Sequence, residues 1–278
     1  MQDLVSTEWL ASELGAPDLV VLDASWHMPS ANRHARAEYE ARHISGARFF
    51  DIDALSDHDS DCPHMLPSAE LFGCAMGDLG VGSGDRIVIY DDSALRTSAR
   101  AWFMLRHFGA LQVAILDGGL AKWVAEGRPT ERGCPAERVA RFDVAERPGE
   151  VVHKDEVRRG TGLPIVDARG AKRFTGEEAD PRPGVAPGHM PGARNLPYAA
   201  MYRDDGTFRS PEELQAAFAG AGVDPTRPFV ASCGSGVTAN SLIFAAHLLG
   251  NDRTRLYDGS WSEWGADAGM PKELGPAA

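Results

Sequence analysis

An internal duplication constrains this chain more than any other feature. The segment DGGLAKW, which starts at Asp117, recurs as DGSWSEW at Asp258, and the segment IVIYDD, which ends at Asp92, recurs around Cys233. The two pairs have the same spacing along the chain, which is hard to obtain by chance similarity. In a chain of 278 residues, this duplication predicts two domains of similar fold.

Two further matches follow in the same order, with slightly longer spacings. LDAS around Asp23 recurs as VDAR around Asp167, and HISGA at His43 recurs as HMPGA at His189. Small insertions explain the longer spacings. Four matches in one order extend the duplication over most of the chain.

A polar segment separates the repeats. Residues 131–150 have lost hydrophobic periodicity, which is typical of a linker. We expect an N-terminal domain at 1–135, a linker at 136–150 and a C-terminal domain at 151–278. The N-terminal domain has an aspartate, Asp92, where the C-terminal domain has Cys233.

Within each half, short apolar runs alternate with amphipathic stretches. The runs are typical of buried strands and lie at 19–22, 87–90, 113–116, 164–166, 229–232 and 255–257. Residues 99–109 and 239–250 have helical patterns that end in glycine. Strands alternating with helices predict the α/β class, with a mainly parallel sheet flanked by helices in each domain.

Charge and hydropathy exclude several kinds of partner. The net charge is −12 and no segment is strongly basic, so we expect neither nucleic acid nor an anionic membrane surface as a partner. No window approaches the ~18 apolar residues of a transmembrane helix. The first residues lack the pattern of a secretory signal, which favours a cytoplasmic location.

The chain has four cysteines, and their spacing matches neither a C-x-x-C pair nor a zinc template. In a reducing compartment they should be free thiols. We expect no catalytic role for Cys62, Cys74 and Cys134. Cys233 differs because of the loop in which it lies.

Cys233 stands between a predicted strand and a predicted helix, in the loop Cys-Gly-Ser-Gly-Val-Thr. The first N–H groups of a helix lack internal partners, and together with the helix dipole they favour a thiolate, which lowers the pKa of a cysteine. Gly234 and Gly236 permit backbone conformations that direct several N–H groups inward. The alternative is a buried structural cysteine beside a glycine-rich turn.

Three other uses of a loop cysteine can be compared with this sequence. Phosphatases need an arginine six positions after the cysteine, where this chain has Ala239. Thioredoxin-like redox chemistry needs a second cysteine three positions on, where this chain has Gly236. A cysteine hydrolase needs a histidine base, and the sequence alone pairs none with Cys233.

The segment CGSGVTA at 233–239 resembles the active-site loop of the 3-mercaptopyruvate sulfurtransferases, which are relatives of thiosulfate sulfurtransferase (rhodanese). The resemblance extends to LDASW, RHISGARFFDID, HMLPS, LDGGLAKW, PGHMPGARNLPY and YDGSWSEW, and so covers nearly the whole chain. It implies two tandem rhodanese-like domains, of which only the second has the catalytic cysteine. Asp92 in the first repeat fits that implication.

The resemblance also implies how a substrate is held. Arg173 and Arg182 match the arginines that bind the carboxylate of the substrate, and a guanidinium fork suits a planar carboxylate. On the sequence alone, either could instead be a surface ion-pair residue. The loop residues implied to contact the substrate are Gly234, Gly236, Val237 and Thr238.

A possible proton relay follows from the same resemblance. Ser235 matches a serine that works with a histidine and an aspartate, which correspond here to His64 and Asp53. The alternatives are that Asp53 only caps a helix and that His64 only fills a loop.

Several other residues are expected to be structural. His43 and His189 occur in both repeats, so we exclude them from the site. Trp261 and Trp264 are expected to pack. Asn240 stands where some relatives have another cysteine, which argues against a second thiol here.

The resulting expectation is a sulfurtransferase. Sulfur passes from 3-mercaptopyruvate to cyanide, a small thiol or a thioredoxin-like protein through a persulfide on Cys233, and pyruvate is released. We expect a monomer without a metal or organic cofactor. The alternatives are a thiosulfate:cyanide sulfurtransferase and a rhodanese-like binding or sulfur-carrier module without catalysis.

Overall fold

A computed structural model describes residues 1–277, which form two compact units. The first unit contains Met1–Ser56, Leu66–Arg147 and Asp204–Phe208, and the second contains Asp57–Met65, Pro148–Arg203 and the chain from Arg209 onward. Each unit therefore includes one short segment from the half of the sequence that mainly builds the other. No helix within 1–277 is long and apolar enough to cross a membrane.

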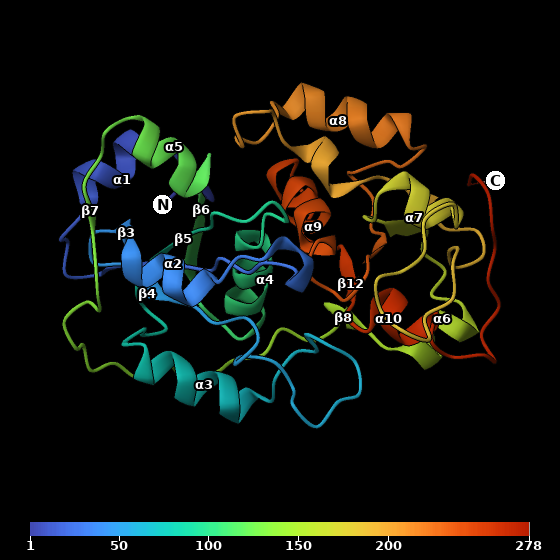
Figure 1. Ribbon diagram of the computed structural model, residues 1–278, viewed down its shortest axis with the longest axis horizontal. Coiled ribbons are helices and arrows are strands. Elements are labelled where there is room, and N and C mark those ends of the chain that lie inside the picture. Colours follow the sequence, from blue (N-terminus) through green and yellow to red (C-terminus); the bar gives the residue numbers. More distant parts are fainter. Residues whose placement is uncertain (278) are drawn as a thin grey trace. The chain divides into compact units, whose positions relative to one another are not determined.

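The first unit is built on a sheet of five parallel strands in the order β1-β6-β5-β2-β4 (Figure 1). Its strands are β1 (Leu4–Val5), β2 (Leu19–Asp23), β4 (Arg48–Phe49), β5 (Arg86–Tyr90) and β6 (Gln112–Leu116). Its α-helices are α1 (Thr7–Glu13), α2 (Ala35–Ala41), α3 (Ala69–Asp78), α4 (Ser98–His107) and α5 (Gly119–Ala125), and a short helix η1 covers Pro29–Ala31. A small antiparallel pair joins β3 (His43–Ile44) to β7 (Thr130–Glu131).

The second unit has an equivalent sheet of five parallel strands in the order β10-β9-β11-β12-β8. Its strands are β8 (Val151–Val152), β9 (Ile165–Asp167), β10 (Arg194–Asn195), β11 (Val230–Ser232) and β12 (Arg255–Tyr257). Its helices are α6 (Lys154–Arg159), α7 (Ala171–Thr175), η2 (Tyr198–Met201), α8 (Pro211–Gly220), α9 (Ala239–Leu248) and α10 (Ser260–Trp264).

The two sheets have the same topology. Read from the opposite end, the second order is β8-β12-β11-β9-β10, which places β2 opposite β9 and β5 opposite β11, as the sequence repeats require. The predicted α/β class and the parallel sheet in each repeat are confirmed. The duplication seen in the sequence is therefore also present in the order of the strands in the two sheets.

Each sheet is covered on both faces, which explains why its central strands are apolar throughout. In the first unit, Leu10 of α1 and Trp123 of α5 pack against Val88 of β5 in one cluster, and Figure 1 shows α3 on the other side of the sheet. Because side chains alternate along a strand, a strand buried on both faces needs a continuous apolar run.

The second unit follows the same plan. Phe174 of α7 and Trp261 and Trp264 of α10 share one cluster with Val230 of β11. Figure 1 shows α8 and α9 on the other side of this sheet. The two tryptophans therefore pack in the core, as expected.

The repeated histidines lie in the two cores. The His43 ring stacks on Tyr39 with 4.2 Å between centroids, and the His189 ring stacks on Phe174 at 3.8 Å. In both, Nδ1 faces a backbone carbonyl, at 2.7 Å and 3.0 Å respectively. The recurrence of HISGA and HMPGA thus has a structural explanation.

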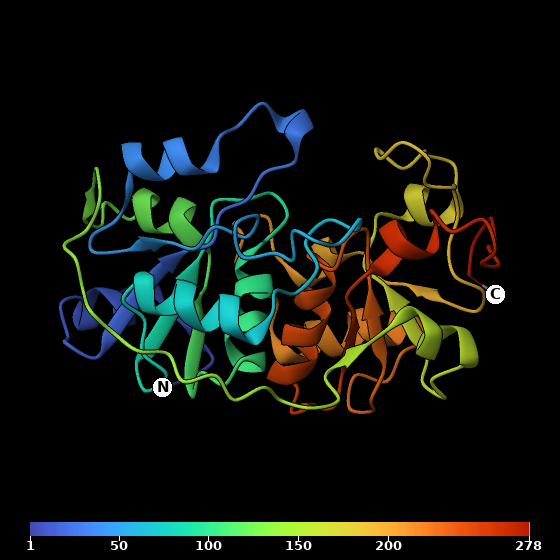
Figure 2. The same ribbon diagram turned by 90° about the horizontal axis from the view of Figure 1, so that it is seen from below.

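The segment after β7 runs along the first unit in extended conformation (Figure 2, yellow-green). Arg138 forms a bidentate ion pair with Asp85 at 2.6 and 2.7 Å, and the Phe142 ring packs edge-on against Phe72. These contacts attach much of the segment 136–147 to the first unit. The domain boundaries at 135 and 151 stay predictions.

Candidate active site

Cys233 directly follows β11 and precedes α9, at the carboxyl end of the parallel sheet in the second unit. Ligands of open parallel sheets bind at this edge, where loops and helix N-termini meet. The Cys233 residue is only 1% exposed. The thiol is therefore held inside the loop rather than displayed on its surface.

A serine that the sequence analysis did not identify fixes the shape of this loop. The Ser260 hydroxyl accepts hydrogen bonds from the backbone N–H of Cys233 at 3.0 Å and of Gly236 at 3.2 Å, and it donates to the Tyr257 carbonyl at 2.8 Å. Ser260 is fully buried. It joins the two ends of the first loop turn to the end of β12.

The backbone at Ser260 is strained, with φ at +50°, a region that glycine adopts most easily. The equivalent position in the first repeat is a glycine, Gly119, with φ at +58°. The serine is retained in the second repeat in spite of the strain, since only a side chain can bridge the two loop amides. Comparing DGG with DGS in the two repeats is the sequence signal that could have identified Ser260.

Four loop amides remain available to an anion. Within residues 1–277, the backbone N–H groups of Gly234, Ser235, Val237 and Thr238 form no hydrogen bond. They lie within six residues at the start of α9, where the helix dipole adds partial positive charge. The loop can therefore stabilise negative charge next to Cys233.

The two predicted glycines serve different purposes. Gly236 has φ at +73°, and a Cβ there would lie 2.6 Å from the Asp258 carbonyl oxygen. Gly234 does not adopt a positive φ, so of the two glycines only Gly236 uses the left-handed region. The absence of a side chain at Gly234 instead leaves room for the two arginines, since a Cβ there would lie 3.2 Å from Arg182 Nη2 and 3.4 Å from Arg173 Nη2.

These distances show that both predicted substrate arginines reach the loop. A buried carboxylate, Asp180, holds the pair: it lies 2.5 Å from Arg173 Nη2 and 3.1 Å from Arg182 Nη1, and it also accepts from the Arg182 backbone N–H at 3.0 Å. The Asp180 side chain is 1% exposed, whereas Arg173 and Arg182 are 20% and 26% exposed. The two guanidinium groups are thus partly accessible to a ligand, whereas the Asp180 carboxylate is not.

Asp180 leaves the arginine cluster with a net positive charge. Burial favours a higher pKa for the Asp180 carboxyl, but the Arg182 N–H and the two guanidinium groups outweigh it and hold this pKa below its ordinary value. The acid is therefore ionised at neutral pH, and two guanidiniums with one carboxylate carry a net charge of about +1. The sequence analysis missed Asp180, although an acid two positions before Arg182 in ADPRPG was a usable signal.

The structure also brings Ser235 and His64 together. His64 Nδ1 lies 2.8 Å from Ser235 Oγ. His64 has φ at +62°, an uncommon conformation for a residue with a side chain. It belongs to Asp57–Met65, the segment that the second unit takes from the first half of the sequence.

Asp53 belongs to the first unit, where its two carboxylate oxygens each lie 2.9 Å from Trp26 Nε1. Trp26 donates this hydrogen bond. The role of Asp53 in a relay with His64 stays a prediction.

The other cysteines have different surroundings. Burial, followed by the nearby Glu263 carboxylate, raises the pKa of the Cys62 thiol, which disfavours its thiolate. Cys74 and Cys134 are exposed, and all four cysteines are free thiols. Within residues 1–277, no cluster of three or more His, Cys, Asp or Glu side chains could hold a metal ion.

Comparison with known families agrees with this architecture. A family model described as a rhodanese-like domain matches the chain twice, at residues 6–126 and 152–267. The chain belongs to the rhodanese family. Asp92 lies in the first family match and Cys233 in the second, so the two repeats differ at this equivalent position.

Relatives within the family match over nearly full length. A 3-mercaptopyruvate sulfurtransferase from Mus musculus is 43% identical, covering 94% of this chain and 91% of the relative. One from Escherichia coli (strain K12) is 42% identical over 97% of each chain. A thiosulfate sulfurtransferase from Cricetulus griseus is 39% identical, covering 94% of this chain and 91% of the relative.

A solved structure in the family has the same fold. The crystal structure of a 3-mercaptopyruvate sulfotransferase from Escherichia coli matches with a TM-score of 0.85 and 40% identity, covering 95% of this chain and all of that one. The prediction of two rhodanese-like domains is confirmed.

Proposed function

We propose that this chain is a 3-mercaptopyruvate sulfurtransferase in which Cys233 carries the transferred sulfur. One observation carries the proposal: two arginines held by Asp180 lie against the Gly234 backbone, one residue from the buried thiol. A 2-oxo acid offers a planar carboxylate to such guanidinium groups, and its C3 substituent can then lie near Cys233. The relatives from Mus musculus and Escherichia coli act, by their names, on this substrate.

In the first step, the Cys233 thiolate attacks the sulfur of 3-mercaptopyruvate. An S–S bond forms and the C3–S bond breaks, so that its electron pair remains on the carbon as the enolate of pyruvate. The new persulfide still holds the proton of the substrate thiol; once that proton has moved to the enolate, the persulfide carries the negative charge, which the loop amides of Ser235, Val237 and Thr238 are suited to stabilise.

The proton of the substrate thiol must reach C3 of the enolate for pyruvate to leave. Ser235 and His64 are suited to this transfer, because their hydrogen bond of 2.8 Å gives a hydroxyl and an imidazole within one relay. Asp53 is proposed as the third member. Protonation of the enolate makes the step irreversible in practice and leaves a covalent intermediate on the enzyme.

In the second step, an acceptor nucleophile takes the outer sulfur and restores the Cys233 thiolate. Cyanide would give thiocyanate, and a thiolate would give a persulfide. We propose a small thiol or a reduced thioredoxin-like protein as the acceptor, and a cytoplasmic monomer as the working form. An acidic chain without a basic patch supports acceptors other than nucleic acid.

Thiosulfate is the competing donor, since the relative from Cricetulus griseus is named for it. A dianion gains most from positive charge next to the cysteine, whereas the residues that follow Cys233 are neutral: Gly234, Ser235 and Gly236. The neutral loop supports mercaptopyruvate as the preferred donor. The ratio of kcat/KM for the two donors decides between them.

Intact-mass measurement after donor treatment tests the proposal directly. The wild-type chain should gain ~32 Da on Cys233, which peptide mapping would locate. Cys233→Ser should gain nothing and release no pyruvate, while Cys62→Ser, with its thiol of raised pKa, should behave as wild type. Sulfur transfer at a normal rate by Cys233→Ser would refute the proposed nucleophile.

A further inference from the structure

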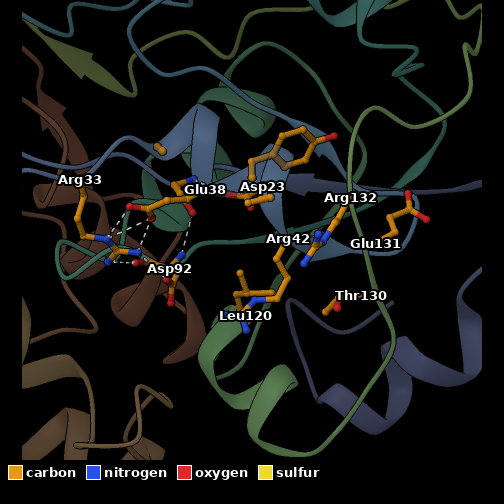
Figure 3. Close-up of a pocket in the computed structure, with 13 residues that line it drawn as sticks. Asp23, Arg33, Glu38, Arg42, Asp92, Leu120, Thr130, Glu131 and Arg132 are labelled. Atoms are coloured by element: carbon orange, nitrogen blue, oxygen red, sulfur yellow. Dashed lines mark hydrogen bonds and ion pairs between the residues drawn. The ribbon is translucent and has the colours of Figure 1, made fainter.

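The first unit has a pocket of about 490 Å³ at the carboxyl ends of its central strands (Figure 3). Asp23, the last residue of β2, and Asp92, which follows β5, both line it, and Leu120 of α5 forms another wall. This is the place in the first sheet that the Cys233 loop has in the second, because Asp92 is the counterpart of Cys233. Its volume is in the range of sites for small molecules.

One end of the pocket is acidic. The Arg33 guanidinium is shared by two carboxylates: Nη2 lies 2.5 Å from Glu38 Oε2 and 2.7 Å from Asp92 Oδ2, and Nη1 donates to the Asp92 carbonyl at 3.0 Å. The one positive charge of Arg33 against the two negative charges of Glu38 and Asp92 gives these three side chains a net charge of about −1.

The other end is basic. Within residues 1–277, the side chains of Arg42 and Arg132 form no hydrogen bond and no ion pair. The nearby Glu131 is directed elsewhere, since its Oε1 accepts from the Gly46 N–H at 2.8 Å and faces His43 Nε2 at 3.3 Å. Figure 3 shows Arg42 and Arg132 together on the side of the pocket away from Arg33. Two unpaired guanidiniums favour a carboxylate ligand.

The floor between the two ends is preorganised. Asp23 is 2% exposed, and its carboxyl accepts the Ser25 N–H at 2.9 Å, while the Ser25 hydroxyl accepts the Asp92 N–H at 2.9 Å. These bonds fix the loop that carries Asp92. The backbone from which the Asp92 carboxylate projects is thus held by the fold.

We propose that this pocket binds a free α-amino acid, with its carboxylate on Arg42 and Arg132 and its ammonium group toward Asp92 and Glu38. A dianion would be repelled by the net negative charge at the Arg33 end, and a simple cation would be repelled by the unpaired guanidiniums of Arg42 and Arg132. Only a zwitterion complements both ends. This inference goes beyond the sulfur-transfer reaction and does not depend on Cys233.

Isothermal titration calorimetry on the full chain tests the proposal. The probe is L-serine, because its hydroxyl accepts no sulfur, and succinate and ethanolamine serve as dianion and cation controls. L-serine should bind saturably with one site per chain, at least tenfold more tightly than either control. If L-serine does not bind saturably, or binds no better than succinate, the proposal is wrong.

Variants locate the site. Arg42→Ala with Arg132→Ala should weaken L-serine binding at least tenfold, whereas Arg141→Ala, whose side chain is 88% exposed outside the pocket, should leave it unchanged. Asp92→Asn should weaken L-serine binding but strengthen succinate binding. Loss of binding in Arg173→Ala, with binding retained in the Arg42 and Arg132 double variant, would assign the amino acid to the second unit and overturn the proposal.

Discussion

His64 and Ser235 are 171 positions apart in the chain, yet the histidine Nδ1 lies 2.8 Å from the serine Oγ. The contact exists because the segment Asp57–Met65 belongs to the second unit. The left-handed backbone at His64 indicates that the surrounding structure determines its position. Such an arrangement suits proton transfer at the loop that holds Cys233.

Removing either partner of this pair should slow chemistry more than binding. Ser235→Ala or His64→Gln should lower kcat for pyruvate release by about 100-fold, the usual size of a general acid–base contribution, with KM changed less than threefold. Single-turnover pyruvate release with 3-mercaptopyruvate measures the effect. A raised KM with unchanged kcat would instead make the pair a binding element.

Asp180 should act on substrate affinity. Asp180→Asn keeps the shape but replaces a charge-assisted pairing with a neutral one, so Arg173 and Arg182 should lose their alignment and KM for 3-mercaptopyruvate should rise by about tenfold. The kcat should fall by less than threefold. Glu178→Gln, two positions away and exposed, is the matched control. Equal KM values for wild type and Asp180→Asn would contradict the positioning role.

Ser260 can be tested with two substitutions that separate its hydroxyl from its backbone strain. Ser260→Ala removes the buried hydroxyl that accepts from the Cys233 and Gly236 N–H groups and should lower the free energy of unfolding by ~2 kcal/mol. Ser260→Gly loses the same hydroxyl but relieves the strain, so it should be ~1 kcal/mol more stable than Ser260→Ala. Denaturant unfolding gives both values.

Activity then discriminates between the two roles of Ser260. Both variants should lower kcat by at least tenfold, because the Cys233 and Gly236 amides lose their common acceptor. If Ser260→Gly has the wild-type kcat, the hydroxyl does not matter for the loop.

Asp23 should make the stability of the chain depend on pH. Burial raises the pKa of its carboxyl from 3.8 to about 6, so between these values the folded chain holds a proton that the unfolded chain has released. This contribution is complete below pH 3.8, declines as the pH rises and is lost above about pH 6. Burial of the ionised carboxylate then costs ~3 kcal/mol relative to low pH.

Asp23→Asn removes this titration while keeping an acceptor for the Ser25 N–H. The variant should match the wild type in unfolding free energy near pH 4 and exceed it by an amount that grows to pH 6 and then stays constant. Denaturant titrations at pH 4, 5, 6 and 7.5 check this course. A stability difference independent of pH would contradict the raised pKa.

The sequence predicted the fold well because the relevant signals are local. Apolar runs at 87–90 and 113–116 became β5 and β6, and the helical pattern at 239–250 became α9. Strand order in the second sheet then follows from the duplication, since equivalent strands occupy equivalent places.

The candidate site was only partly predictable, because its supporting groups act through tertiary contacts. Cys233, Arg173 and Arg182 could be named from the family resemblance, and the structure brings the two arginines to the Gly234 backbone. Asp180 and Ser260 matter through bonds to those residues, which no local pattern reports. Asp180 lies in a loop and Ser260 at the first position of the short helix α10, where neither helical nor strand periodicity is informative.

Gly119 and Ser260 occupy equivalent positions, and the difference between them limits what the first repeat can do. Placing a thiol at position 92 would not make the first repeat a second sulfur carrier, since Gly119 offers no hydroxyl to tie the loop and Arg33 already occupies its mouth. Sulfur transfer by the first repeat would require at least three replacements together: a cysteine at position 92, a serine at position 119 and a different residue in place of Arg33. Asp92 and Gly119 thus leave the first repeat without the thiol and the hydroxyl of the Cys233 loop, and its pocket is available for a different ligand.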